Sequence, residues 1–160
     1  MDTSNPRFLP GILAIGGGGL IIVGSFLPWI AATLPLVGTL SRNGLDGGGD
    51  GLISLGIGIE VAVMGLAFMS ATSGLKRPDV FVGIGGGLAI VGAIFEYENV
   101  SNRISGLSPL AQGLAHVGSG IYVIGVGGIL AAIASERMSH VVQPPPKPPE
   151  QPTTPPPMPE

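Results

Sequence analysis

The stretch GLISLGIGIEVAVMGLAFMSA, residues 51–71, contains a single charged side chain, Glu60, within an otherwise apolar run. About 20 apolar residues in a helix that rises ~1.5 Å per residue are enough to cross the ~30 Å hydrocarbon core of a bilayer. Other stretches approach or reach this length at residues 11–31, 80–96 and 113–134. The stretch at residues 80–96 is short, so it would need local bilayer thinning or an extension to the interface.

The composition extends this interpretation to the whole chain. Of the 160 residues only 11% are charged, and 28 are glycine. A soluble domain of this length could bury one such helix but hardly four. We therefore predict an all-α integral membrane four-helix bundle over residues 11–136, with a cytoplasmic N-terminus at 1–10. The chain has no cysteine, which excludes disulfides, thiolate metal sites and thiol nucleophiles.

The distribution of Lys and Arg predicts the topology. Cations collect in the loops that face the cytoplasm. One set of alternate segments carries five cations and the other set carries two; they are Arg7, Lys76, Arg77, Arg137 and Lys147, against Arg42 and Arg103. This asymmetry places both termini on the cytoplasmic side of the plasma (inner) membrane. Trp29 and Tyr97 are then expected to anchor the outer interface, where amphipathic rings settle.

Small residues four positions apart predict close helix packing. Helices in lipid associate through tight packing and hydrogen bonds, and small residues let their backbones approach. The predicted packing positions are Ser54, Gly58, Ala62, Gly83, Gly87, Gly127 and Ala131. The glycine run at residues 16–19 costs roughly 1 kcal/mol of helix propensity per residue in water, so a neighbouring helix should fill the missing volume.

Glu60, Tyr122 and His116 are the predicted intramembrane polar residues. A buried ionised carboxylate is costly, so we expect Glu60 to be protonated or paired. Tyr122 is the preferred internal partner and His116, nearer the outer surface, is the less favoured one. Two roles remain open for Glu60: a structural hydrogen bond, or a site that handles a proton or a cation.

No motif indicates catalysis, a cofactor, a metal or a nucleic-acid partner. The glycine-rich GIGGGLAIVG at residues 83–92 lacks the lysine and Ser/Thr of a phosphate-binding loop. The loop SRNGLDGGGDG at residues 41–51 lacks the alternating acids and closing glutamate of a calcium-binding loop. No Ser/His/Asp spacing or catalytic carboxylate pair stands out.

The C-terminal QPPPKPPEQPTTPPPMPE, residues 143–160, cannot form a helix, because proline lacks an amide donor and fixes its own torsion. We predict a disordered, proline-rich cytoplasmic tail over residues 137–160. Its segment Pro144–Pro159 has the composition that aromatic grooves of cytoplasmic proteins recognise. The alternative is a solvated tail without a dedicated partner.

Two short motifs carry a resemblance to a known group of proteins. GSFLPW at residues 24–29 and NGLDGGGDGLISL at residues 43–55 resemble segments of small, uncharacterised bacterial four-helix membrane proteins. Those proteins have an FLPW turn after helix one and a GL…DG segment before helix two. The resemblance covers about the first 70 residues, and it implies a bacterial plasma membrane and no known activity.

These observations favour a non-enzymatic accessory subunit. An excess of small residues on more than one helix face, with few polar positions, suits helices that pack against other membrane protein subunits within the lipid bilayer. One alternative is a small transporter or ion-conducting oligomer centred on Glu60. Another is a membrane scaffold that recruits a cytoplasmic partner through the proline-rich tail.

Overall fold

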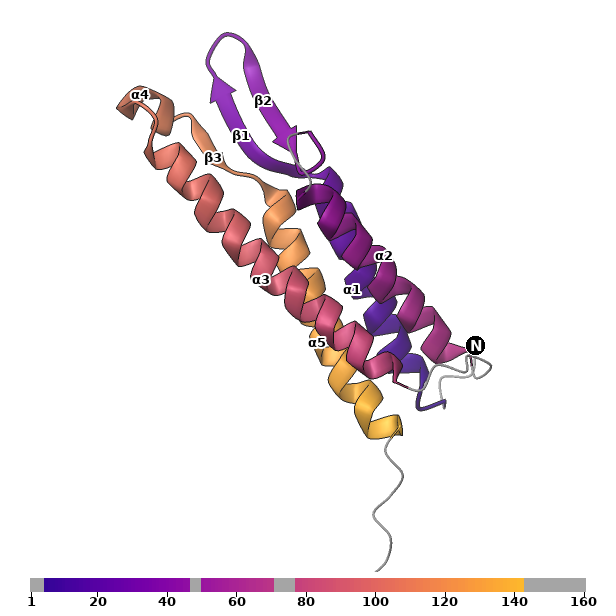
Figure 1. Cartoon of the computed structure of the whole chain (residues 1–160). Helices are drawn as coiled ribbons and strands as arrows, with labels where there is room; N and C mark the ends of the chain where they lie inside the picture. Colours follow the sequence, from indigo (N-terminus) through magenta and orange to yellow (C-terminus); the bar gives the residue numbers. More distant parts are fainter. Residues whose placement is uncertain (1–4, 47–49, 71–76, 143–160) are drawn as a thin grey trace, which may run out of the picture.

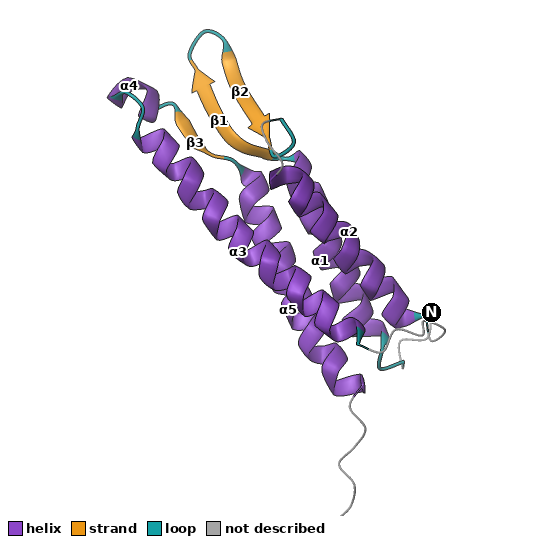
Figure 2. Cartoon of the chain, viewed as in Figure 1, coloured by secondary structure: helices purple, strands orange, loops and turns teal. Residues whose placement is uncertain are grey.

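A computed structural model describes residues 5–46, 50–70 and 77–142 of the chain. This part is mostly helical, and its long helices are α1 (Phe8–Phe26), α2 (Asp50–Met69), α3 (Pro78–Ser105) and α5 (Ser119–Val142) (Figure 1). Within the described residues, these four helices are long and apolar enough to cross a membrane. The shorter elements are α4 (Pro109–Gln112) and the strands β1 (Pro28–Leu34), β2 (Gly38–Asn43) and β3 (Ala115–Val117) (Figure 2).

The long helices lie side by side, with α1 against α2 and α5, and α3 against α5 and α2. Neighbours run antiparallel, because Gly18 near the middle of α1 meets Gly58 and Ala62 of α2, whereas Gly11 meets Gly65 and the side chain of Met69. The connection between α1 and α2 contains β1 and β2, and the one between α3 and α5 contains α4 and β3.

The glycine run of α1 explains how that helix is held between two others. A Cβ on Gly17 would stand 2.7 Å from the Gly127 carbonyl oxygen of α5, and one on Gly18 would stand 2.6 Å from the Ala62 nitrogen of α2. A Cβ on Gly16 or Gly19 would meet nothing within 4 Å. Two of the four glycines therefore permit backbone contact, and the other two face outward.

A small antiparallel sheet of order β2-β1-β3 lies at the end of the helices where α1 ends and α2 begins (Figures 1 and 2). Pro28 ends α1, because a residue that precedes proline is pushed out of the helical region, and Leu27 has φ −75° and ψ 160°. Gly38, with φ +88°, begins β2 after the turn that follows β1. The all-α prediction omitted this sheet.

The predicted bounds of three helices need correction. The first stretch, 11–31, begins at Phe8 and ends at Phe26, because the chain then enters β1. The third, 80–96, extends to Ser105, and its added turns pack the buried Val100 beside Trp29 in one apolar cluster.

The fourth predicted stretch, 113–134, is displaced toward the C-terminus and becomes α5, Ser119–Val142. Its extra turns carry Met138, whose side chain is fully buried. Residues 137–142 therefore belong to a helix, although the sequence had placed them in the tail. The rest of that predicted tail, including Pro144–Pro159, lies outside the described residues.

Candidate functional site

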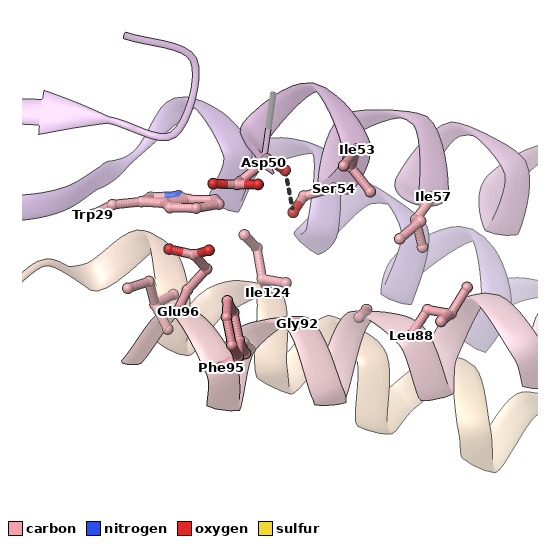
Figure 3. Close-up of a pocket in the computed structure, with 13 residues that line it drawn as sticks. Trp29, Asp50, Ile53, Ser54, Ile57, Leu88, Gly92, Phe95, Glu96 and Ile124 are labelled. Carbon is pink, nitrogen blue, oxygen red and sulfur yellow. Dashed lines mark hydrogen bonds between the residues drawn. The ribbon is translucent and has the colours of Figure 1, made fainter. Parts of the chain in front are cut away.

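A cleft between α2 and α3 opens at the end of the helices that carries the sheet (Figure 3). It consists of an apolar cavity of about 180 Å³ and a polar cavity of about 230 Å³. The two cavities share Trp29, Asp50 and Glu96 as lining residues, so they adjoin each other. We call the apolar part the slot, the polar part the mouth, and the whole the α2–α3 cleft.

Two glycines of α3, about two helical turns apart, explain why the cleft exists. A Cβ on Gly85 would stand 2.7 Å from Val61 of α2, so the two helices are in close contact at that level. A Cβ on Gly92 would meet nothing within 4 Å, although Gly92 lines the slot. Because residues i and i+7 share one face of a helix, α2 and α3 must separate between these two positions. The slot occupies the resulting gap.

Apolar side chains from both helices form the walls of the slot. Ile53 and Ile57 come from α2, whereas Leu88 and Phe95 come from α3 (Figure 3). Ile53, Leu88 and Phe95 are 62%, 54% and 65% exposed, so they reach the outer surface of the helices as well as the slot. The slot is therefore accessible from the side of the molecule.

Charged groups of both signs line the mouth. Figure 3 shows the carboxylates of Asp50 and Glu96 on either side of the Trp29 indole. Glu96 lies near enough to interact with Asp50, with the Asn99 side chain and with Arg103. Arg42 also lines the mouth, and its guanidinium donates a hydrogen bond of 2.7 Å to the Asp46 carbonyl oxygen.

Trp29 is a packed residue of the mouth. Its side chain is only 7% exposed, and the indole Nε1–H donates a hydrogen bond of 3.0 Å to the Gly24 carbonyl oxygen. That carbonyl lies in the last turn of α1, where helix carbonyls lack partners within the helix. The prediction of a membrane-interface anchor at Trp29 is therefore corrected, because its ring is buried within the chain and fixes β1 to α1.

Glu60 and Tyr122 do not come together. Gly18 of α1 contacts α2 at Gly58 and Ala62, and the adjacent Gly17 contacts α5 at Gly127 and Ala131, so Glu60 is level with that part of α5. Tyr122 lies five residues before Gly127 on α5, which is about 7.5 Å along the helix axis. Instead, the Tyr122 ring makes an edge contact with the Tyr97 ring, with the ring centroids 6.0 Å apart.

The remaining residues predicted at membrane depth or at its interface are at least partly exposed. Glu60 is half-buried, and no described residue forms a hydrogen bond or an ion pair with its carboxylate. His116 is exposed on β3, opposite Ala31 of β1, so it belongs to the sheet and not to a candidate membrane span. Tyr97 is 43% exposed on α3.

Most of the predicted packing positions do contact a neighbouring helix. Gly58 and Ala62 meet α1, Gly127 and Ala131 also meet α1, and a Cβ on Gly83 would stand 2.6 Å from Ser135 Oγ of α5. Two positions differ. A Cβ on Gly87 would meet nothing within 4 Å, and the Ser54 hydroxyl donates a hydrogen bond to the Asp50 carbonyl oxygen of its own helix (Figure 3).

A second hollow lies on the outer surface between α3 and α5. This groove has a volume of about 500 Å³, and the Tyr97–Tyr122 pair forms part of its lining. Small residues of both helices, Ala93 and Gly125, line it together with Ile94 and Val126. A Cβ on Gly125 would stand 3.7 Å from the Ala93 Cβ, an ordinary contact distance. We call this hollow the α3–α5 groove.

Sequence reasoning missed the α2–α3 cleft. In the sequence, Asp50 lies in the loop 41–51 and Glu96 at the end of the stretch 80–96, and no local pattern relates the two. Their placement at the ends of two adjacent candidate spans is the signal that could have paired them. Among the described residues, no group of three His, Cys, Asp or Glu side chains could hold a metal ion.

Comparisons with protein families, curated proteins and solved structures found no match to this chain.

Proposed function

We propose that this chain is a multi-pass protein of the bacterial plasma membrane and a non-enzymatic accessory subunit of a larger membrane assembly. Its four long helices would form a transmembrane bundle with both termini in the cytoplasm. A transmembrane helix of the partner would dock in the α3–α5 groove. The groove is the observation that carries this proposal.

The exposed surface of the helices supports a membrane location. Large apolar side chains are exposed along all four long helices, for example Ile12, Leu66, Val91 and Ile129. Soluble monomers rarely expose contiguous apolar patches larger than a few hundred Å². Lipid tails would cover this surface without cost.

The positions of the cations support the proposed orientation. Arg7, Arg77 and Arg137 belong to the end of the helices where α1 and α3 begin and α5 ends. Arg42 and Arg103 lie at the sheet end. The end with more cations is expected to face the cytoplasm.

The α3–α5 groove has the features that favour a helix partner. Small residues let helix backbones approach, and tight packing contributes most of the association energy in lipid. Gly125 and Ala93 supply such a surface, and the Tyr97–Tyr122 pair adds two phenol groups near one end. Outward glycines elsewhere, such as Gly16 and Gly19, show that small residues occur on other faces too.

A pair of matched leucine variants tests the proposal. Gly125→Leu fills the groove, whereas Gly16→Leu places the same side chain in open space on α1. We expect a stoichiometric partner to co-purify with the wild-type chain and with Gly16→Leu after crosslinking in native membranes and extraction in mild detergent. Gly125→Leu should lose most of that partner.

Two results would overturn the proposal. One is a wild-type chain that is recovered without a crosslinked partner. The other is a partner that Gly125→Leu retains at the wild-type level, provided that both variants insert and unfold at the wild-type temperature.

The alternative functions gain no comparable support. A transporter centred on Glu60 needs further polar groups along the membrane, and neither Tyr122 nor His116 lies beside Glu60. The scaffold alternative depends on Pro144–Pro159, which lies outside the described residues.

A further inference from the structure

The α2–α3 cleft combines an apolar slot with a mouth that carries both signs of charge. The slot follows the helix axes from Trp29 toward Ile57 and Leu88, and it is open at the side (Figure 3). A ligand that suits it is amphipathic, with an extended apolar chain and a polar headgroup. In a bilayer, a phospholipid meets this description and can enter from the side.

The negative half of the mouth places two carboxylates close together. Among residues 5–46, 50–70 and 77–142, the one ion pair joins Arg77 to Asp79 at 3.3 Å, near the opposite end of α3. Neither Asp50 nor Glu96 forms an ion pair there, although Glu96 interacts with Arg103 and with the Asn99 side chain, and the two carboxylates lie near enough to repel each other. A cation placed between two carboxylates would relieve this repulsion.

The positive half of the mouth can hold an anion. Arg42 uses one guanidinium nitrogen for the Asp46 carbonyl, and a guanidinium has five N–H donors in all. Arg103, in the last turn of α3, is the second guanidinium at the mouth. Guanidinium groups bind phosphate with two parallel hydrogen bonds.

We propose that the α2–α3 cleft binds a zwitterionic phospholipid with a primary-amine headgroup, such as phosphatidylethanolamine. Its ammonium contacts the carboxylates of Asp50 and Glu96 beside the Trp29 indole, its phosphate faces Arg42 and Arg103, and one acyl chain fills the slot. A primary ammonium offers three N–H donors to the two carboxylates. A quaternary choline group offers none, and a glycerol headgroup carries no positive charge. This inference rests on the proposed membrane location but not on the partner.

The binding test uses the full-length chain in vesicles of three compositions. One contains phosphatidylethanolamine and phosphatidylglycerol, one contains phosphatidylcholine and phosphatidylglycerol, and one contains all three lipids. After mild extraction, native mass spectrometry measures the lipid that remains bound. We expect phosphatidylethanolamine to remain at about one molecule per chain and the other two lipids to be lost. Equal retention of phosphatidylcholine or phosphatidylglycerol would overturn the proposal.

Variants of the mouth test the role of its charges. We expect the double variant Asp50→Asn with Glu96→Gln to weaken phosphatidylethanolamine retention by about tenfold or more, equivalent to about 1.4 kcal/mol. Glu98→Gln, an exposed carboxylate outside the cleft on the same helix, serves as the matched control. Retention by the double variant at the wild-type level would contradict the assignment.

Variants of the slot give an independent measurement that leaves the charges intact. Gly92→Leu fills the slot without a clash, because a Cβ there would meet nothing within 4 Å. Gly87→Leu is equally free of contacts and lies outside the cleft. We expect Gly92→Leu to lose the lipid and Gly87→Leu to retain it. Lipid binding by both variants would show that no acyl chain occupies the slot. That outcome would leave the proposed membrane insertion of the chain unaffected.

Discussion

Glycine acts in this chain as a packing surface, and its effect depends on the direction in which each residue faces. Gly17 and Gly18 of α1 are neighbours in sequence, yet they contact different helices. Gly16 and Gly19 flank them and contact neither. The same residue type therefore has opposite expected effects on stability at adjacent positions.

Alanine substitutions should separate these effects. Gly18→Ala puts a methyl group 2.6 Å from the Ala62 nitrogen, so we expect it to destabilise the chain by about 1–3 kcal/mol through overpacking. Gly16→Ala meets no atom within 4 Å and should be neutral or stabilising, by up to about 1 kcal/mol of helix propensity. Thermal unfolding in detergent measures both. Equal losses would show that α1 does not pack as described.

The environment of Glu60 determines the free-energy cost of placing its carboxylate inside a helix. An ionised acid at the centre of a membrane helix costs at least about 2.5 kcal/mol even on insertion scales. An interhelical hydrogen bond in lipid contributes only about 0.6 kcal/mol on average, so pairing alone does not offset ionisation. Glu60 forms no hydrogen bond or ion pair with any of the described residues.

At the level of single elements, the sheet depends on Trp29. This side chain connects β1 to the last turn of α1 through its bond to Gly24, and it belongs to the buried cluster that also contains Val100 of α3. A Cβ on Gly44 would stand 2.5 Å from the indole, so the chain after β2 also packs closely on Trp29. One ring therefore joins both strands of the hairpin region to the helices.

We expect Trp29→Phe to lower the stability of the chain by about 1–3 kcal/mol, because the Gly24 carbonyl oxygen loses a buried donor. Phe26→Leu is the control, since Phe26 is 54% exposed and lies next to the same turn. The shift in unfolding temperature in detergent measures both changes. An unfolding temperature that Trp29→Phe leaves unaltered would contradict a role for the indole in fixing β1.

The elements were not equally predictable from the sequence. The four long helices were located, because long apolar runs are the strongest local signal. The strands were missed because β3 covers only Ala115–Val117, and β1 follows the apolar run of α1 without a polar break. The predicted ends of α3 and α5 differ from the observed ones, because buried residues such as Val100 and Met138 extend these helices beyond their apolar runs.

The site was less predictable than the helices. Contacts at Gly58, Ala62, Gly127 and Ala131 follow from local spacing, because small residues four apart lie on one helix face. The α2–α3 cleft depends on how far apart two helices lie along their length, and no local pattern encodes that separation. The two helices are in contact at Gly85 and apart at Gly92, and only the packed structure reveals this.

At the scale of the whole molecule, the proposed orientation is directly testable because the chain has no native cysteine. A cysteine at Asn43, near the end of β2, should react with a membrane-impermeant maleimide in intact cells. A reporter fused after Glu160 should behave as cytoplasmic. A cysteine at Arg137 is the control for the opposite side and should react only after the cells are opened. The reverse pattern would invert the assigned orientation.

The glycine contacts that hold α1 between α2 and α5 also set the width of the packed helices in cross-section. Helices that touch through their backbones lie closer together than helices separated by bulky side chains, which stand about 8–10 Å apart. In the proposed bilayer setting, a smaller cross-section displaces fewer lipid tails. Lateral pressure from those tails then favours the assembled helices over separated ones, so membranes that press harder on their proteins would hold this fold together more firmly.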